Sequence, residues 1–215
     1  MSRAAARSSG SGRRARMSGK ERREQLIGVA RAVFAERGFE AASIEEIAER
    51  AAVSKPVVYQ HFGGKEGLYA VVVDREVGHL LALITAALEA DHPRLAVEQA
   101  ATAFLAYIEK HQEGFRILVR DAPVGTSTGT LPSIIRDVAA NAESLLAAEF
   151  GQRGYDPDVA PVYARALVGM VALVGEWWLD AGTPKRQEVA AHLANLAWNG
   201  LKALDPQPTL MRLPS

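Results

Sequence analysis

Polar side chains that could bind DNA are concentrated in one short segment, residues 54–62, with the sequence SKPVVYQHF. A helix over residues 55–62 would turn Val58 and Phe62, four residues apart, toward a core. Its other positions would then project ammonium, phenol, amide and imidazole groups, which can contact phosphates and base edges. The segment therefore predicts the second helix of a helix-turn-helix, the helix that enters the major groove. The candidate contacts here are Ser54, Lys55, Pro56, Val57, Tyr59, Gln60 and His61.

Each candidate contact has an expected role. Lys55 at the helix start can pair with a phosphate, and Tyr59 can donate its hydroxyl to one. Pro56 and Val57 can touch a thymine methyl group, and Gln60 can bind adenine edges. These are the interactions that a recognition helix needs.

A helix over residues 44–51 should position the recognition helix. Ser43 is a good N-cap for it, and Glu46 three residues later completes a capping box. Residues 52–54 form the turn, and Ser54 caps the next helix. Lys65 opens the helix that follows, where its ammonium and the free backbone N–H groups favour an anion. We therefore add Ser43 and Lys65 to the expected DNA contacts.

Helical periodicity accounts for most of the chain, and no alternating strand pattern appears. A first helix is expected over residues 20–37, with Gly38 as a left-handed C-cap. Further helices are expected over residues 65–89, 94–112, 114–120, 131–150, 158–181 and 184–204, with a turn-rich loop at 122–130. The predicted fold class is all-α.

The charge distribution supports a DNA-binding head. Residues 1–65 hold 13 Lys and Arg against 7 Asp and Glu, a net charge of +6, and the remainder carries −6. Such a head would be attracted to phosphate while the acidic body would not, although chance could also produce this asymmetry. The first 23 residues carry eight basic residues and one acidic residue. They are consistent with a phosphate-seeking arm, a solubilising tail, or a start assigned too early with Met17 as the true first residue.

Several other classes of protein are not supported. The chain has no Cys, so disulfides and thiolate sites are excluded. It has no run of about 18 apolar residues and no secretory signal pattern, so we expect a cytoplasmic protein with no membrane span. The histidines lack metal-ligand spacing, and no GxSxG, HExxH or phosphate-loop pattern occurs, so neither metal, cofactor nor enzymatic activity is expected.

The head resembles a known family. The segment AVFAERGFEAASIEEIAERAAVSKPVVYQHFGGKEGLY resembles the N-terminal domain of the TetR family of transcriptional regulators. One departure is Ala52, where the family usually has Gly, and Ala adopts that turn conformation only at a cost. The resemblance implies about nine helices, with domain bounds of 1–19 for a flexible basic arm, 20–66 for the helix-turn-helix, 67–205 for a ligand-binding and dimerisation domain, and 206–215 for a frayed tail.

The resemblance also implies a homodimer, a palindromic DNA operator, an unknown small-molecule ligand and, in most members, repression. Pairing is expected on physical grounds too, because one recognition helix gives little specificity. The expected dimer interface is Tyr163, Leu167, Met170, Val174, Trp177, Trp178, Leu193 and Leu196. The expected ligand pocket is Phe104, Tyr107, Ile108, Phe115, Leu118 and Val119. For both sets, ordinary core packing is the alternative, and a small-molecule-binding protein without an operator is the alternative function.

Overall fold

The structure is a computed structural model that describes residues 17–90, 92–119 and 131–210. Most of the predicted basic arm and the whole predicted loop 122–130 lie outside these residues. In order, the helices are α1 (Gly19–Ala41), α2 (Ile44–Arg50), α3 (Lys55–Phe62), α4 (Lys65–Leu88), α5 (Pro93–Lys110), α6 (Gln112–Val119), α7 (Leu131–Arg153), the 3₁₀ turn η1 (Pro157–Val159), α8 (Ala160–Ala181) and α9 (Arg186–Lys202). The expected all-α class and about nine helices are confirmed within these ranges.

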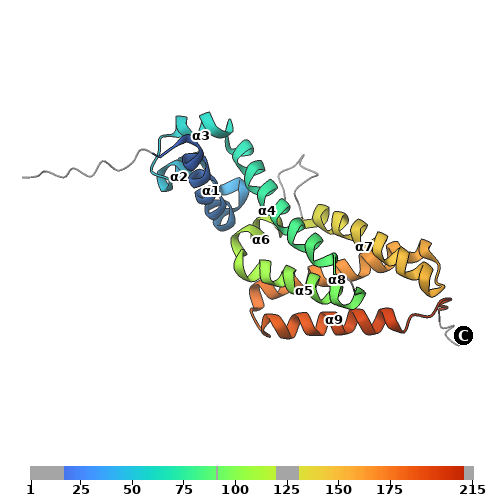
Figure 1. The fold of residues 1–215 in the computed structure, drawn as a ribbon. Helices are drawn as coiled ribbons and strands as arrows, with labels where there is room; N and C mark the ends of the chain where they lie inside the picture. The colour runs from blue at the N-terminus through green and yellow to red at the C-terminus, as the bar shows by residue number, and fades with distance from the viewer. Residues whose placement is uncertain (1–16, 91, 120–130, 211–215) are drawn as a thin grey trace, which may run out of the picture.

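The molecule has a small head and an elongated body. Helices α1, α2 and α3 form the head at one end, and α4 runs from the head into the body (Figure 1). In the body, α7 packs along α8 and α5 packs along α9, while α6 contacts α1. The recognition helix predicted from the sequence therefore lies at the end of the molecule farthest from α9.

The head is held by a continuous apolar core. Leu26, Ile47 and Val58, one from each of its three helices, have no exposed surface. Phe34 packs edge-on against Tyr69 of α4, with ring centroids 5.0 Å apart. Since the three helices are too short to bury a large core alone, α4 completes it.

The backbone of the head agrees with the sequence analysis at the turn and departs from it at the end of α1. Ala52 has a φ of 52°, as expected for an Ala in a position that favours Gly. Gly38 also has a positive φ, 77°, but its ψ of 171° is far from the left-handed helix that we predicted. The chain therefore kinks at Gly38 and continues for a further turn to Ala41.

A buried carboxylate joins the head to the body. Glu76 of α4 is only 6% exposed, and one carboxylate oxygen accepts a 2.7 Å hydrogen bond from the hydroxyl of Tyr107 on α5. Its other oxygen lies 3.5 Å from the guanidinium of Arg31 on α1. Arg31 also donates to Glu113 of α6 at 3.2 Å. Four helices thus meet at one charged group, which needs these partners because an unpaired buried charge is costly.

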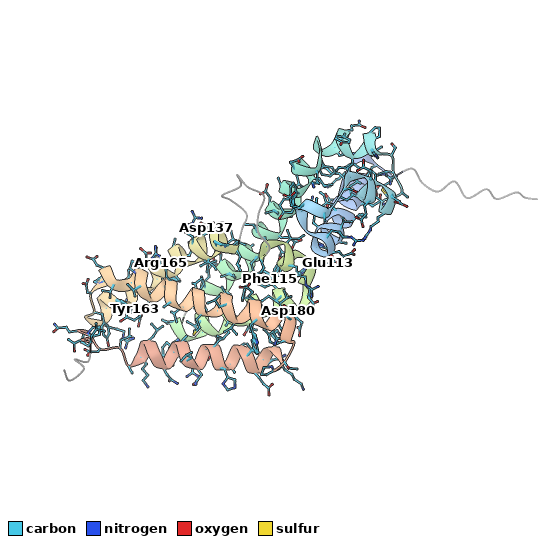
Figure 2. The ribbon with its side chains drawn as sticks, turned by 180° about the vertical axis from the view of Figure 1, so that it is seen from behind. Glu113, Phe115, Asp137, Tyr163, Arg165 and Asp180 are labelled. Atoms are coloured by element: carbon cyan, nitrogen blue, oxygen red, sulfur yellow. The ribbon has the colours of Figure 1, made fainter. Side chains whose placement is uncertain are left out.

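Gly114 of α6 makes room for this carboxylate. A Cβ atom at Gly114 would lie 2.1 Å from the carboxylate oxygen of Glu76 and 3.0 Å from the Tyr107 hydroxyl. The first distance is far below van der Waals contact, so only glycine lets α6 approach this closely. Figure 2 shows Glu113, the neighbour of Gly114, where the body meets the head.

The segment Pro157–Ala181, which contains α8, is long and apolar enough to cross a membrane by length and composition. Only 22% of its most apolar window is buried within the chain. Arg165 and Glu176 interrupt its apolar residues, so it does not stand out in the sequence as an unbroken apolar run. One side of α8 packs on α7, so its remaining apolar surface requires a separate explanation.

We predict that Gly114→Ala lowers the free energy of unfolding by about 1–3 kcal/mol, because the added methyl group overpacks the site of Glu76. Gly78→Ala is the matched control, since Gly78 lies in α4 with no atom within 4 Å of its virtual Cβ. That change should stabilise the protein by about 0.5–1 kcal/mol through helix propensity. Denaturant unfolding measures both. Equal effects of the two substitutions would contradict the close approach at Glu76.

Candidate nucleic-acid interface and ligand cavity

Helix α3 presents a polar flank to solvent and anchors it through its apolar back. Val58 is fully buried, whereas Tyr59 is 52% exposed. Ser54, Lys55, Pro56 and Gln60 are also exposed, and Val57 and His61 are half-buried. Gly63 ends the helix in the left-handed conformation, and its N–H donates to the Tyr59 carbonyl. The seven side chains proposed on this segment therefore lie on or next to one accessible surface.

Lys55 is the basic group at the start of α3, and it has a partner within the head. Its ammonium donates to the carboxylate of Glu45 on α2. This hydrogen bond holds the pKa of Glu45 below its ordinary value. Both side chains are more than half exposed, so the pair contributes little to stability and is open to exchange with another anion. This pairing was not predicted from the sequence, where Glu46 was the acidic residue of α2 given a role.

The two serines at the helix starts differ. The Ser43 hydroxyl accepts from the backbone N–H of Glu46 at 3.1 Å, as expected for an N-cap. The Glu46 side chain instead accepts from Arg50 at 2.6 Å. Ser54 occupies the N-cap position of α3 but makes no side-chain cap hydrogen bond. Its exposed hydroxyl is therefore available to bind a molecule that contacts this surface.

Lys65 at the start of α4 has its partners within the head. Its ammonium donates to the carbonyls of Phe39, Glu40 and Ala42 at 2.9, 3.2 and 3.2 Å. It also lies 4.4 Å from the centroid of the Phe39 ring. An ammonium has three donors, and here all three satisfy carbonyls at the end of α1. Lys65 therefore clamps α4 to α1, and its contact with phosphate stays a prediction.

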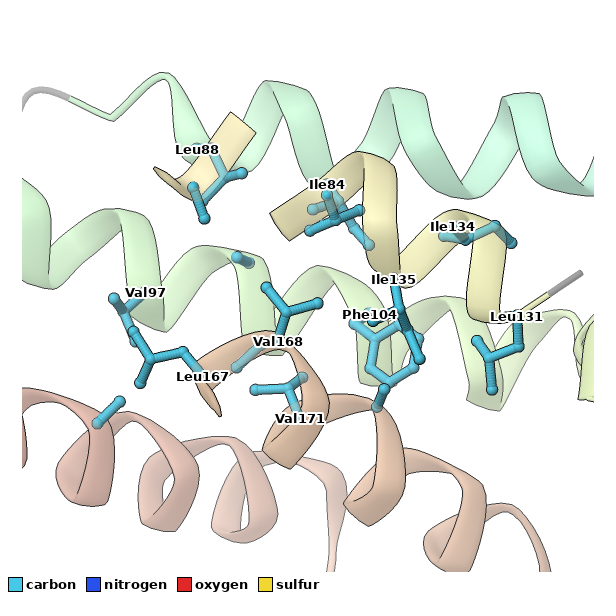
Figure 3. Close-up of a pocket in the computed structure, with 16 residues that line it drawn as sticks. Ile84, Leu88, Val97, Phe104, Leu131, Ile134, Ile135, Leu167, Val168 and Val171 are labelled. Carbon is cyan, nitrogen blue, oxygen red and sulfur yellow. The ribbon is translucent and has the colours of Figure 1, made fainter. Parts of the chain in front are cut away.

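The body contains an apolar cavity with a volume of about 110 Å³ (Figure 3). It is bordered by α4, α5, α7, α8 and α9. Its lining residues are Ile84, Leu88, Val97, Ala100, Ala101, Phe104, Leu131, Ile134, Ile135, Val138, Ala142, Leu167, Val168, Val171, Ala172 and Ala197. The volume is similar to that of an engineered apolar cavity of about 150 Å³ that stays dry and binds small apolar molecules. This cavity is the candidate ligand site.

Of the six residues expected to form a pocket, only Phe104 lines the cavity. Tyr107, Ile108, Phe115 and Leu118 are each at most 1% exposed and fill the core around α5 and α6. Val119 is half-buried and packs against the same core. Periodicity placed these residues on inward faces correctly, but it gave no information on which inward face borders empty space. The contributions of α7 and α8 to the lining were missed for that reason.

The residues expected at a dimer interface lie in four environments. Trp177 and Leu196 are 56% and 62% exposed. Trp178 and Leu193 are buried, and the Trp178 indole donates to the Pro184 carbonyl at 2.7 Å. Leu167 lines the cavity. The other three residues are half-buried, Tyr163 against Phe150 and Met170 and Val174 against the main core.

An exposed apolar face on α8 and α9 nevertheless exists. Val162 and Leu173 of α8 are 66% and 68% exposed, and they join Trp177 and Leu196. Figure 2 shows α8 and α9 both on the near side of the body, with Arg165 and Asp180 labelled on α8. We call these four side chains the α8–α9 face. The spacing of Leu173 and Trp177, one helical turn apart, was a signal that could have identified Leu173 from the sequence.

Two family profiles match the chain. Residues 26–72 match the bacterial regulatory proteins of the tetR family. Residues 93–200 match a tetracyclin repressor-like C-terminal domain. The first match covers the head with the start of α4, and the second covers the body from α5 to α9.

Individual proteins agree with these matches. The HTH-type transcriptional activator FasR of Mycolicibacterium smegmatis is 35% identical over 187 residues, covering 84% of this chain and 83% of FasR. The HTH-type transcriptional repressor BdcR of Escherichia coli is 35% identical over 69 residues, covering 31% of this chain and 35% of BdcR. A crystal structure of a TetR-like transcriptional regulator from Rhodococcus sp. RHA1 superposes with a TM-score of 0.74 at 28% identity, covering 88% of this chain and all of that one.

Proposed function

The chain belongs to the TetR family of bacterial transcriptional regulators, a non-enzymatic family, and we propose that it binds a palindromic DNA operator as a homodimer whose affinity a small molecule controls. The observation that carries this proposal is the exposed polar flank of α3, backed by the fully buried Val58. Such a helix can enter a major groove without unfolding any part of its head. The proposed contacts are Ser43, Ser54, Lys55, Pro56, Val57, Tyr59, Gln60 and His61.

The electrostatics of the head support contact with phosphates. The Lys55 ammonium is shared with Glu45 on the protein surface, where ion pairs are weak. A phosphate at the same position would pair with the Lys55 ammonium. It would also lie at the N-terminus of α3, where the helix dipole favours negative charge. Exchanging Glu45 for phosphate is therefore favourable at low salt and weakens as salt screens it.

The α8–α9 face supports pairing of two chains. It exposes Leu173, Trp177 and Leu196 together, and large aromatic residues are enriched at protein interfaces. A second copy packed there would bury them symmetrically and explain why α8 is so apolar on its outer side. Two heads would then be held at a fixed spacing, as a palindrome requires.

The sign of regulation is the second part of the proposal. Repression is the expectation that follows from most members of the family, and the relative BdcR is named a repressor. Activation is the competing candidate, because FasR, which matches 84% of this chain, is named an activator. A reporter gene behind the selected operator distinguishes them, since repression predicts higher expression when the regulator is deleted and activation predicts lower expression.

We predict that selection from random DNA yields a palindrome whose affinity falls steeply with salt. Tyr59→Ala should weaken binding about tenfold. Lys55→Ala should weaken binding too, and it should reduce the magnitude of the slope of log affinity against log salt concentration by about one. Lys202→Ala, at the far end of α9, is the matched control and should have no effect. Lys65→Ala is expected to reduce stability, because it leaves three α1 carbonyls without their donor.

Electrophoretic mobility shifts at several salt concentrations measure these effects. Unchanged affinity in both Tyr59→Ala and Lys55→Ala would refute the contact assignment. If the folded protein retains no DNA from the pool, the alternative of a small-molecule-binding protein without an operator is favoured.

We predict that Leu173→Glu produces a monomer, because the substitution would bury a carboxylate in the interface between two copies. Leu145→Glu is the matched control, since Leu145 on α7 is 50% exposed and lies outside the α8–α9 face. Sedimentation equilibrium should show a dimer for the control and half that mass for Leu173→Glu, and circular dichroism should show that both variants remain helical. A dimer in both variants would place the interface elsewhere.

A further inference from the structure

We infer that the cavity in the body takes an aliphatic chain, with the polar end of the ligand held outside it; this inference rests on the proposed ligand control. All sixteen lining residues are Ala, Val, Leu, Ile or Phe. Phe104 is the one aromatic residue among them. No side chain of the lining can therefore donate or accept a hydrogen bond, and the ligand must be recognised by apolar contact alone.

The shape of the cavity favours a chain over a compact ring system. Its lining residues on α7 run from Leu131 to Ala142, which corresponds to about 16 Å along the helix axis. Residues of α5 and α8 follow the same direction on the opposite side, as Figure 3 shows. Yet the volume is only about 110 Å³. A long and narrow apolar space matches a thin, flexible hydrocarbon.

The energetics exclude polar ligands from the cavity itself. A hydroxyl or amide placed there would lose its hydrogen bonds to water without replacement. Each methylene that enters gains about fourfold in affinity, because its surface leaves water. Affinity should therefore rise with chain length until the cavity is filled and then level off. A fatty acid and its coenzyme A thioester share this recognition and differ only in the part outside.

The test measures direct binding of butyrate, hexanoate, octanoate and dodecanoate, and of their coenzyme A thioesters, by calorimetry below micellar concentrations. We expect a steep rise with chain length followed by a plateau. If the acids and the thioesters show the same dependence of affinity on chain length, the protein recognises the chain alone. If only one series shows it, that series identifies whether the ligand is the free acid or the thioester. Affinity that does not depend on chain length, or no binding at all, would overturn the inference.

Matched variants locate the site. Ala142→Leu fills the cavity from α7 and should weaken the longest ligand about tenfold or more. Ala140→Leu makes the same change on an exposed position of the same helix and should leave binding unchanged. Val168→Thr keeps the shape of the lining, adds a hydroxyl, and provides a second variant if Ala142→Leu does not fold. Equal binding in all of these variants would refute the site.

Operator binding without ligand is measured on the same protein. If the protein binds an operator but no aliphatic ligand, only this inference is wrong. If it binds the aliphatic ligand but no operator, the proposed function is wrong and the cavity assignment stands.

A separate observation, the buried carboxylate of Glu76, carries a second inference. Phe104 of the cavity packs edge-on against Phe115 of α6, with ring centroids 5.5 Å apart. Phe115 packs in turn against Tyr107 at 6.4 Å, and the Tyr107 hydroxyl donates to Glu76 at 2.7 Å. Arg31 of the head lies next to the same carboxylate. An unbroken series of contacts thus connects the cavity to α1.

We propose that Tyr107 and Glu76 are positioning residues that transmit the state of the cavity to the head. Burial and the neighbouring carboxylate raise the pKa of the Tyr107 hydroxyl, so it remains a donor. A shift of the Phe104 ring would move Phe115 and Tyr107 because cores are densely packed. The interaction of the Glu76 carboxylate with the Arg31 guanidinium would then strengthen or weaken. Arg31 also donates to Glu113, so its balance between the two carboxylates would change. Occupancy and DNA affinity would be coupled through this exchange.

A double-mutant cycle tests the second inference without any ligand. Ala142→Leu serves as a permanent occupant, and we expect it to change operator affinity and the hydrogen-exchange rates of α1 amides. Adding Tyr107→Phe, which keeps the ring and removes the hydroxyl, should abolish both changes. Tyr155→Phe is the matched control, because its hydroxyl bonds the Leu204 carbonyl at 3.0 Å, away from the series.

Three outcomes would overturn the transmission role. They are an Ala142→Leu variant whose α1 exchange and operator affinity equal those of the parent, changes that survive Tyr107→Phe, and changes that Tyr155→Phe removes equally. The exchange readout needs no DNA, so it remains decisive even if operator binding fails.

Discussion

A single buried carboxylate, that of Glu76, determines how the head and the body of this protein fit together. It is 6% exposed and has its main hydrogen-bond donor, Tyr107, in the body and a cation, Arg31, in the head. A charge in the interior is tolerable only with such partners, so α1, α4, α5 and α6 are required to converge at one point. The absence of a side chain at Gly114 lets them do so.

The same arrangement divides the apolar residues of the body into three environments. The first is the core around Tyr107 and Phe115, next to the carboxylate, where both side chains are at most 1% exposed. The second is the lining of the cavity, which Phe104 borders. The outer sides of α8 and α9 remain apolar and exposed, at Leu173 and Trp177 among others. One long helix, α8, borders both the cavity and the exposed face, so pairing of two copies and filling of the cavity would act on the same element.

The head is built for a different purpose. Its stability comes from the back of each helix, and α3 leaves its polar flank without structural duties apart from the weak pair of Lys55 with Glu45. Lys65 shows the opposite arrangement, because its charge is fully used in holding carbonyls of α1. The difference between these two lysines is the difference between a group available to a partner and a group that maintains the fold.

The sequence by itself determined the helices, the turn and the polar flank of α3. These depend on local rules: the N-cap at Ser43 and the apolar period that turns Val58 inward. Only the tertiary structure decided what each inward residue meets, as with Leu167 at the cavity, and that Lys65 serves α1. Periodicity identifies the face of a helix on which a residue lies, whereas its neighbours depend on how distant segments pack.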